Sequence, residues 1–95
     1  MIAVKVKFVG VLHEVFRKKQ MTLRFAKSPS VSDIVERLAE TSSKARRSVL
    51  EAETSQVHPA LLILVNGREI GALNRAETRV KDRDEVVLIS VSHGG

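Results

Sequence analysis

Residues Ser28–Glu40, SPSVSDIVERLAE, decide the fold class, because their apolar residues repeat with the period of a helix. Ser30 is a suitable N-cap, and Asp33 stands three residues later, where the acid of a capping box belongs. The apolar residues at positions i, i+3, i+4 and i+7 form one stripe: Val31, Ile34, Val35 and Leu38. We therefore expect one amphipathic helix whose stripe faces a core.

Two segments before this helix have the period of strands. Residues 2–8 and 21–25 alternate apolar and polar side chains, which is typical of half-buried strands. The link between them, residues 9–19, is long for a tight turn. We expect it to be a functional or loosely ordered loop.

The second half of the chain has the strongest strand signal. Residues 60–65 are apolar without interruption and end at the turn pair Asn66-Gly67. Apolar side chains on both faces indicate either a central strand or a strand with one face on the core and one on a partner. Residues 70–73 suggest a short edge piece, and residues 85–91 a last strand.

The order of these segments predicts an α+β fold. Residues 41–53 are polar and predict either a second, shorter helix or an ordered loop. One main helix on one face of a mixed sheet of four to five strands is the ubiquitin-like β-grasp arrangement. The competing ferredoxin-like sandwich needs two full crossing helices. We expect residues 1–91 to form a single domain and residues 92–95 a flexible tail.

The composition excludes several classes of function. The chain has no cysteine, so it has no disulfide and no thiol nucleophile, and a reducing cytoplasm is the expected location. No apolar run is long enough to span a membrane. The net charge is +5, but with three aromatic residues and no Tyr or Trp, a nucleic-acid partner is disfavoured. His13, His58 and His93 lack the spacing of metal ligands, so we expect no metal site.

Three motifs point to a known family. They are LLILVNGREI (Leu61–Ile70), VKDRDEVVLIS (Val80–Ser90) and the closing Gly94-Gly95. The whole chain resembles the ubiquitin-like sulfur carriers, a family that includes the small subunit of molybdopterin synthase, the thiamine sulfur carrier and the ubiquitin-related modifiers. Arg83 stands where many molybdopterin carriers have glycine, and no proline precedes the glycines. The His-Gly-Gly ending is most similar to the ubiquitin-related modifiers.

The resemblance implies a carrier rather than an enzyme. An E1-like adenylating enzyme would use ATP to activate the Gly95 carboxylate, and this chain would bind no cofactor itself. A sulfurtransferase or cysteine desulfurase would then supply sulfur for a thiocarboxylate that serves tRNA thiolation, or a lysine of a target protein would take the acyl group. Gly94 would give a stem thin enough to enter the enzyme, with His93 behind it.

Such a carrier needs a docking surface for its enzyme. In the last strand the even-numbered residues are expected to face the core, which leaves Val87, Ile89 and Val91 facing outward beside the tail. Arg68 and Arg83 lie near turns and are expected to steer an acidic enzyme toward this row. Two rival functions stay open: the small subunit of molybdopterin synthase, and a small basic nucleic-acid-binding domain.

Overall fold

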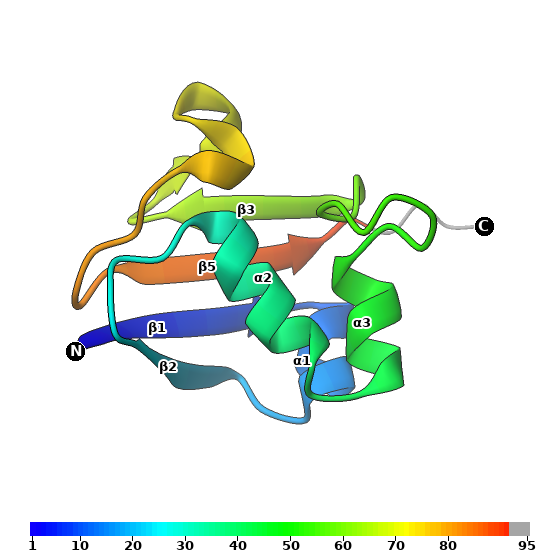
Figure 1. Cartoon of the computed structure of the whole chain (residues 1–95). Coiled ribbons are helices and arrows are strands. Elements are labelled where there is room, and N and C mark those ends of the chain that lie inside the picture. Colours follow the sequence, from blue (N-terminus) through cyan, green and yellow to red (C-terminus); the bar gives the residue numbers. More distant parts are fainter. Residues whose placement is uncertain (92–95) are drawn as a thin grey trace.

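A mixed five-stranded sheet forms the framework of the molecule, with the helices on one side of it (Figure 1). The computed structural model of the chain describes residues 1–91. The strand order is β2-β1-β5-β3-β4. The strands are β1 (Ile2–Val9), β2 (Gln20–Phe25), β3 (Leu61–Val65), β4 (Arg68–Glu69) and β5 (Glu85–Ser90).

The first and last strands lie side by side at the centre of the sheet. β1 pairs with β5 in parallel, and every other neighbouring pair is antiparallel. The main helix crosses one face of this sheet, as Figure 1 shows. The predicted β-grasp fold is therefore confirmed. The predicted tail, residues 92–95, lies outside the described residues, and so do His93, Gly94 and Gly95.

The main helix, α2 (Val31–Ala39), begins at a complete capping box. The Asp33 N–H donates to Ser30 Oγ at 3.0 Å, and the Ser30 N–H donates to Asp33 Oδ2 at 2.9 Å. Two backbone donors that a helix start leaves unpaired are thereby satisfied. The predicted helix start and its acid are confirmed.

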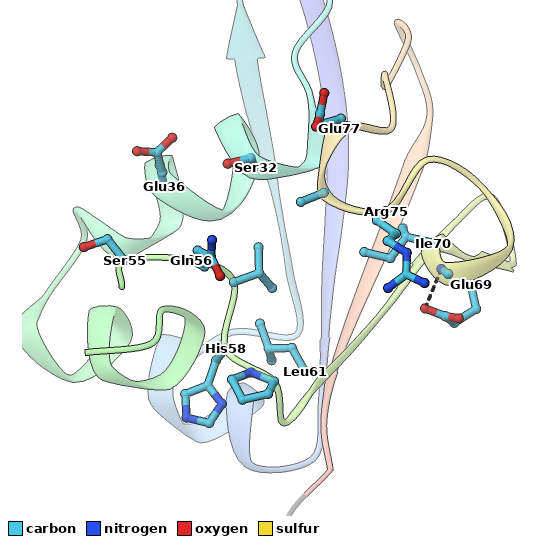
Figure 2. A pocket seen from close by; sticks show the side chains of 14 residues that line it. Ser32, Glu36, Ser55, Gln56, His58, Leu61, Glu69, Ile70, Arg75 and Glu77 are labelled. Carbon is cyan, nitrogen blue, oxygen red and sulfur yellow. Dashed lines mark hydrogen bonds between the residues drawn. The ribbon is translucent and has the colours of Figure 1, made fainter. Parts of the chain in front are cut away.

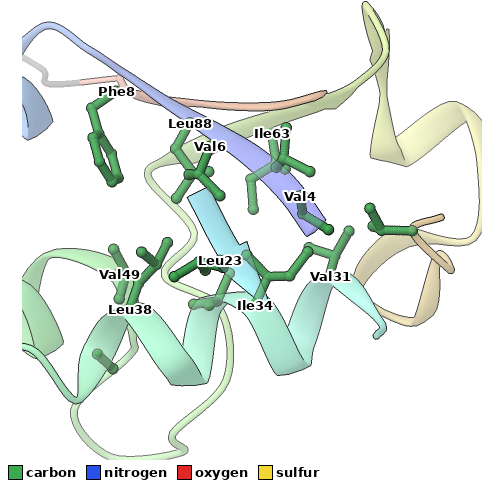
Figure 3. Packing of buried hydrophobic residues seen from close by; sticks show 14 of the residues in the cluster. Val4, Val6, Phe8, Leu23, Val31, Ile34, Leu38, Val49, Ile63 and Leu88 are labelled. Carbon is green, nitrogen blue, oxygen red and sulfur yellow. The ribbon is translucent and has the colours of Figure 1, made fainter. Parts of the chain in front are cut away.

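The core lies between α2 and the inner face of the sheet (Figure 3). Val86 and Leu88 of β5 are fully buried there, which confirms the predicted phase of the last strand. Figure 3 shows side chains from the strands meeting side chains from α2: Val4, Val6, Ile63 and Leu88 on the sheet side, and Val31, Ile34 and Leu38 on the helix side. Every strand that contributes here does so through alternate residues, as period-two geometry requires.

The prediction of a loop between the first two strands is wrong. Residues Val11–Phe16 form a short helix, α1, that begins after Gly10 and ends at Arg17 in a left-handed conformation. Leu12 is fully buried, and the Phe16 ring stacks on Phe8 with centroids 4.2 Å apart. A helix of six residues is only marginally stable by itself, so these tertiary contacts hold it in place.

The polar segment that follows α2 contains a helix, so the helical alternative is correct. This helix, α3 (Ser43–Val49), starts at Ser42, whose Oγ accepts the Ala45 N–H at 3.0 Å. Val49 and Leu50 are buried and fix its position on the core. No helix within residues 1–91 has the length and apolar character to cross a membrane.

The edge piece is shorter and earlier than predicted. β4 comprises Arg68–Glu69, and Ile70–Ala72 forms a turn of 3-10 helix, η1; a second turn, η2, spans Arg75–Glu77. The Glu69 carboxylate accepts the Gly71 N–H at 2.9 Å. Because this bond and the turn use the backbone donors locally, the segment leaves the sheet after two residues.

Leucine-to-alanine substitutions on the two faces of the sheet should differ in their effect on stability, because only one face contributes to the core. Leu88→Ala removes a fully buried side chain and should lower the free energy of unfolding by about 2–5 kcal/mol. Leu62→Ala removes the same atoms from the outer face, where 36% of the residue is exposed, and should cost less than about 1 kcal/mol. Urea unfolding of both variants measures the difference; equal losses would contradict the assigned phase.

The capping box predicts a second stability effect. Ser30→Ala removes the hydroxyl that caps α2 and should cost about 1 kcal/mol of unfolding free energy. Ser30→Asp keeps an acceptor at the cap and should retain most of the stability. The same urea titrations test this, and an unchanged midpoint for Ser30→Ala would show that the cap contributes nothing.

Candidate docking face

The helix-free face of the sheet carries a continuous group of apolar side chains from its three inner strands. The register places Ile89 of β5 between Val9 of β1 and Leu62 of β3. One step along, Val87 lies between Lys7 and Leu64. We call this group the outer apolar face; its members are Val9, Leu62, Leu64, Val87 and Ile89.

The outer apolar face is open to solvent. Val9 is 44% exposed and Leu62 36%, while Leu64, Val87 and Ile89 are half-buried by their neighbours. Val91 follows β5, continues its alternation and is 42% exposed. Contiguous apolar side chains outside the core are common at protein-contact surfaces, which makes this face the candidate docking surface. Val87 and Ile89 of the predicted outward row thus belong to a broader face, and Val91 lies just beyond the end of β5.

A polar border limits this face on the side of β1. Lys7 Nζ lies 3.0 Å from the Glu85 carboxylate, and both side chains are partly exposed. Ion pairs at a surface add little stability. This pair lies near the start of β5, where the apolar group ends. A partner that covers the face would meet this pair at its rim.

The two arginines assigned to the docking surface do not lie beside the chain exit. Arg68 pairs with Val65, at the end of the sheet where β5 begins, and the Arg83 N–H donates to Ala3 O at 2.7 Å. Val91 lies at the opposite end of β5. Since a strand of six residues is about 20 Å long, the arginines can contact a partner only at the far end of the face.

The last described residue is held to the sheet. The Val91 N–H donates to Ala60 O at 2.7 Å, just before β3 begins. This bond fixes where the chain leaves β5, beside Ile89 and Leu62. The described part of the chain therefore ends at the same end of the sheet as Ile89 and Leu62.

Sequence reasoning missed three members of the outer apolar face: Val9, Leu62 and Leu64. A signal for two of them was present, because residues 60–65 are apolar on both faces and only one face can contact the core. Val9 lies just past the predicted strand of residues 2–8, so it was not assigned to either face. Only the parallel pairing of β1 with β5 shows that it lies beside Ile89.

The other candidate groups do not assemble into a site. No cluster of three or more His, Asp or Glu side chains in residues 1–91 is placed to hold a metal ion. His58 Nδ1 accepts the Ala60 N–H at 3.0 Å and has a structural role. The basic groups are divided: Arg17 and Lys18 lie near α3, whereas residues 79–83 lie beside the start of β1.

Comparisons with known proteins identify related sequences and folds. The chain is 28% identical over 97 residues to ubiquitin-related modifier 1 of Schizosaccharomyces pombe, with 99% of this chain and 100% of that protein covered. Small archaeal modifier protein 1 from Methanosarcina acetivorans superposes with a TM-score of 0.86 and 26% identity, covering 100% of this chain and 98% of that one. Urm1 from Trypanosoma brucei gives a TM-score of 0.77 and 26% identity, with coverage of 98% and 95%.

The family model for Urm1, the ubiquitin related modifier, matches residues 3–95, which is nearly the whole sequence. The match includes β1 from its second residue onward, the other four strands, α2 and the closing glycines. This chain therefore belongs to the Urm1 family of ubiquitin-related modifiers.

Proposed function

We propose that this chain is a ubiquitin-like sulfur carrier and protein modifier that an E1-like enzyme activates at the Gly95 carboxylate. The observation that carries the proposal is the family match over residues 3–95, joined to an exposed apolar face at the strand that leads into Gly94-Gly95. The small subunit of molybdopterin synthase shares the fold, but the match to Urm1 favours the modifier reading.

The chemistry of the carboxylate explains the need for an enzyme. A carboxylate repels nucleophiles and has no good leaving group. The activating enzyme transfers AMP from ATP to the Gly95 oxygen and releases pyrophosphate. The terminal sulfur of a cysteine persulfide on a sulfurtransferase or cysteine desulfurase then attacks the acyl carbon and displaces AMP. A thiol cleaves the S–S bond of the resulting acyl disulfide, which leaves a disulfide on the enzyme and a thiocarboxylate on Gly95 for tRNA thiolation. A target lysine amine that attacks the activated acyl group instead forms an isopeptide bond.

The chain itself contributes a surface that the activating enzyme recognises and a tail that can enter the active site of that enzyme. The outer apolar face gives the enzyme an area to bury, and Val91 fixes the point from which the tail departs. Gly94 has no Cβ, so the backbone can approach the nucleotide closely in a narrow channel. The chemical groups that activate the carboxylate belong to the enzyme.

Mass spectrometry of the chain from its own host tests the carrier chemistry. Exchange of one Gly95 oxygen for sulfur adds about 16 Da, and a tandem fragment at Gly95 separates it from oxidation at Met1 or Met21. The Gly94→Ala variant should lose this species, because its added methyl group obstructs the channel, while its urea midpoint stays unchanged. If the wild-type chain remained unmodified in the presence of the activating enzyme, ATP and a sulfur donor, the carrier proposal would be contradicted.

A charge placed on the outer apolar face tests docking. Ile89→Asp or Leu62→Asp should lower kcat/KM for adenylation by the cognate activating enzyme at least about tenfold, because a buried, unpaired carboxylate opposes association. Thr22→Asp places the same charge on the same side of the sheet at the edge strand β2 and is the matched control. Pyrophosphate release measures adenylation. Equal rates for Ile89→Asp and Thr22→Asp would remove this face from the docking surface.

A further inference from the structure

A groove of about 610 Å³ lies on the side of the sheet that the helices cover, away from the outer apolar face. Figure 2 shows its walls: α2 on one side, the loop before β3 below it, and the segment from β4 to η2 on the other. Its volume is within the range of natural binding pockets. The family match and the chemistry at Gly95 give it no role.

The floor of the groove is apolar. Val57, Leu61 and Ile70 are half-buried and pack against the core, and each also lines the groove. Pro59 and Ala76 add further apolar surface. A floor of this kind can accommodate an apolar side chain from outside, since burial of its remaining exposed area is favourable.

The rim of the groove is acidic. Glu36 comes from α2, Glu69 from β4 and Glu77 from η2, against one cation, Arg75 (Figure 2). None of these three carboxylates forms a salt bridge with a residue in the described part of the chain. The whole chain carries a net charge of +5, whereas these three carboxylates and one guanidinium sum to −2.

The wall opposite α2 is held by its own hydrogen bonds. The Asn74 N–H donates to Thr78 Oγ1 at 3.0 Å, and Thr78 is 8% exposed. Arg75 in this wall and Ser55 in the loop both have a positive φ, of 51° and 59°. Such conformations are unfavourable for these residues and persist where the surroundings fix them. The Asn74–Thr78 hydrogen bond orders this wall without a ligand, which lowers the cost of ordering it on binding.

We propose that this groove binds a segment of a partner protein in which an apolar side chain is flanked by lysine or arginine residues. The three carboxylates stand on three separate elements around the floor, so a ligand with one cation can match only one of them. A peptide with several cations about one apolar anchor matches them together. Nucleic acid and anionic lipid are repelled by the same rim. The inference does not depend on the chemistry at Gly95.

The position of the groove leaves the outer apolar face free. A partner segment can therefore occupy the groove while an enzyme covers the other side of the sheet. The groove would then determine which basic protein the carrier binds. The outer apolar face would determine which enzyme activates the carrier.

An NMR titration of the ¹⁵N-labelled full chain tests the proposal. The probe is an acetylated and amidated heptapeptide, GKKLKKG, with GQQLQQG and GEELEEG as matched peptides. The basic peptide should shift the amides of Gln56, Leu61 and Gly71 in a saturable way, and the other two should not. Added salt should weaken its binding, because exposed charges attract it.

Two sets of variants show whether the groove itself is responsible. Glu36→Gln with Glu69→Gln and Glu77→Gln should weaken binding about tenfold, from the loss of three exposed charge contacts. Glu14→Gln with Glu40→Gln and Glu53→Gln changes the net charge equally, outside the groove, and should have little effect. Arg75→Asn removes the opposing cation, suits a left-handed backbone and should strengthen binding.

Several outcomes would overturn the proposal. One is the absence of a saturable shift at millimolar GKKLKKG, or shifts confined to the outer apolar face. Another is equal weakening by both triple variants, which would show attraction to charge anywhere on the surface. Binding of GQQLQQG as tight as that of GKKLKKG would remove the role of the acidic rim.

Discussion

The parallel pairing of β1 with β5 is the constraint on which the rest of this structure depends. Parallel neighbours cannot be joined by a tight turn, so the chain between them has to cross the sheet. Here that chain supplies α2, which covers the inner face, and β3, which pairs with the other side of β5. The first and last strands thus define both the centre of the sheet and the direction in which the chain leaves it.

This constraint gives β5 two functions at once. Val86 and Leu88 complete the core, while Val87 and Ile89 form the middle of the outer apolar face. Because side chains alternate between faces, a shift of one residue in register would expose the core pair and bury the other. Burial of the inner residues therefore sets the orientation of the outer ones. Packing of the core therefore also orders the outer apolar face.

The helix side of the sheet has a different character. The outer apolar face is nearly uncharged within its border, whereas the groove beside α2 combines an apolar floor with carboxylates from three elements. One face suits a large partner that buries area, and the other suits a short basic segment. The two proposed surfaces lie on opposite sides of the sheet, so a segment bound in the groove does not cover the outer apolar face.

The sequence by itself determined the features that depend on neighbouring residues. The stripe and cap of α2, the phase of β1 and β5 and the family signature at Gly94-Gly95 are all readable from local order. Features that depend on contacts between segments far apart in the chain were decided only by the tertiary structure. α1 forms because Phe16 stacks on Phe8, Val9 joins Leu62 because β5 lies between their strands, and Arg68 and Arg83 lie away from the chain exit. Periodicity reports which side of an element is apolar, but not which element it will meet, since that depends on the register and direction of strands far apart in the chain.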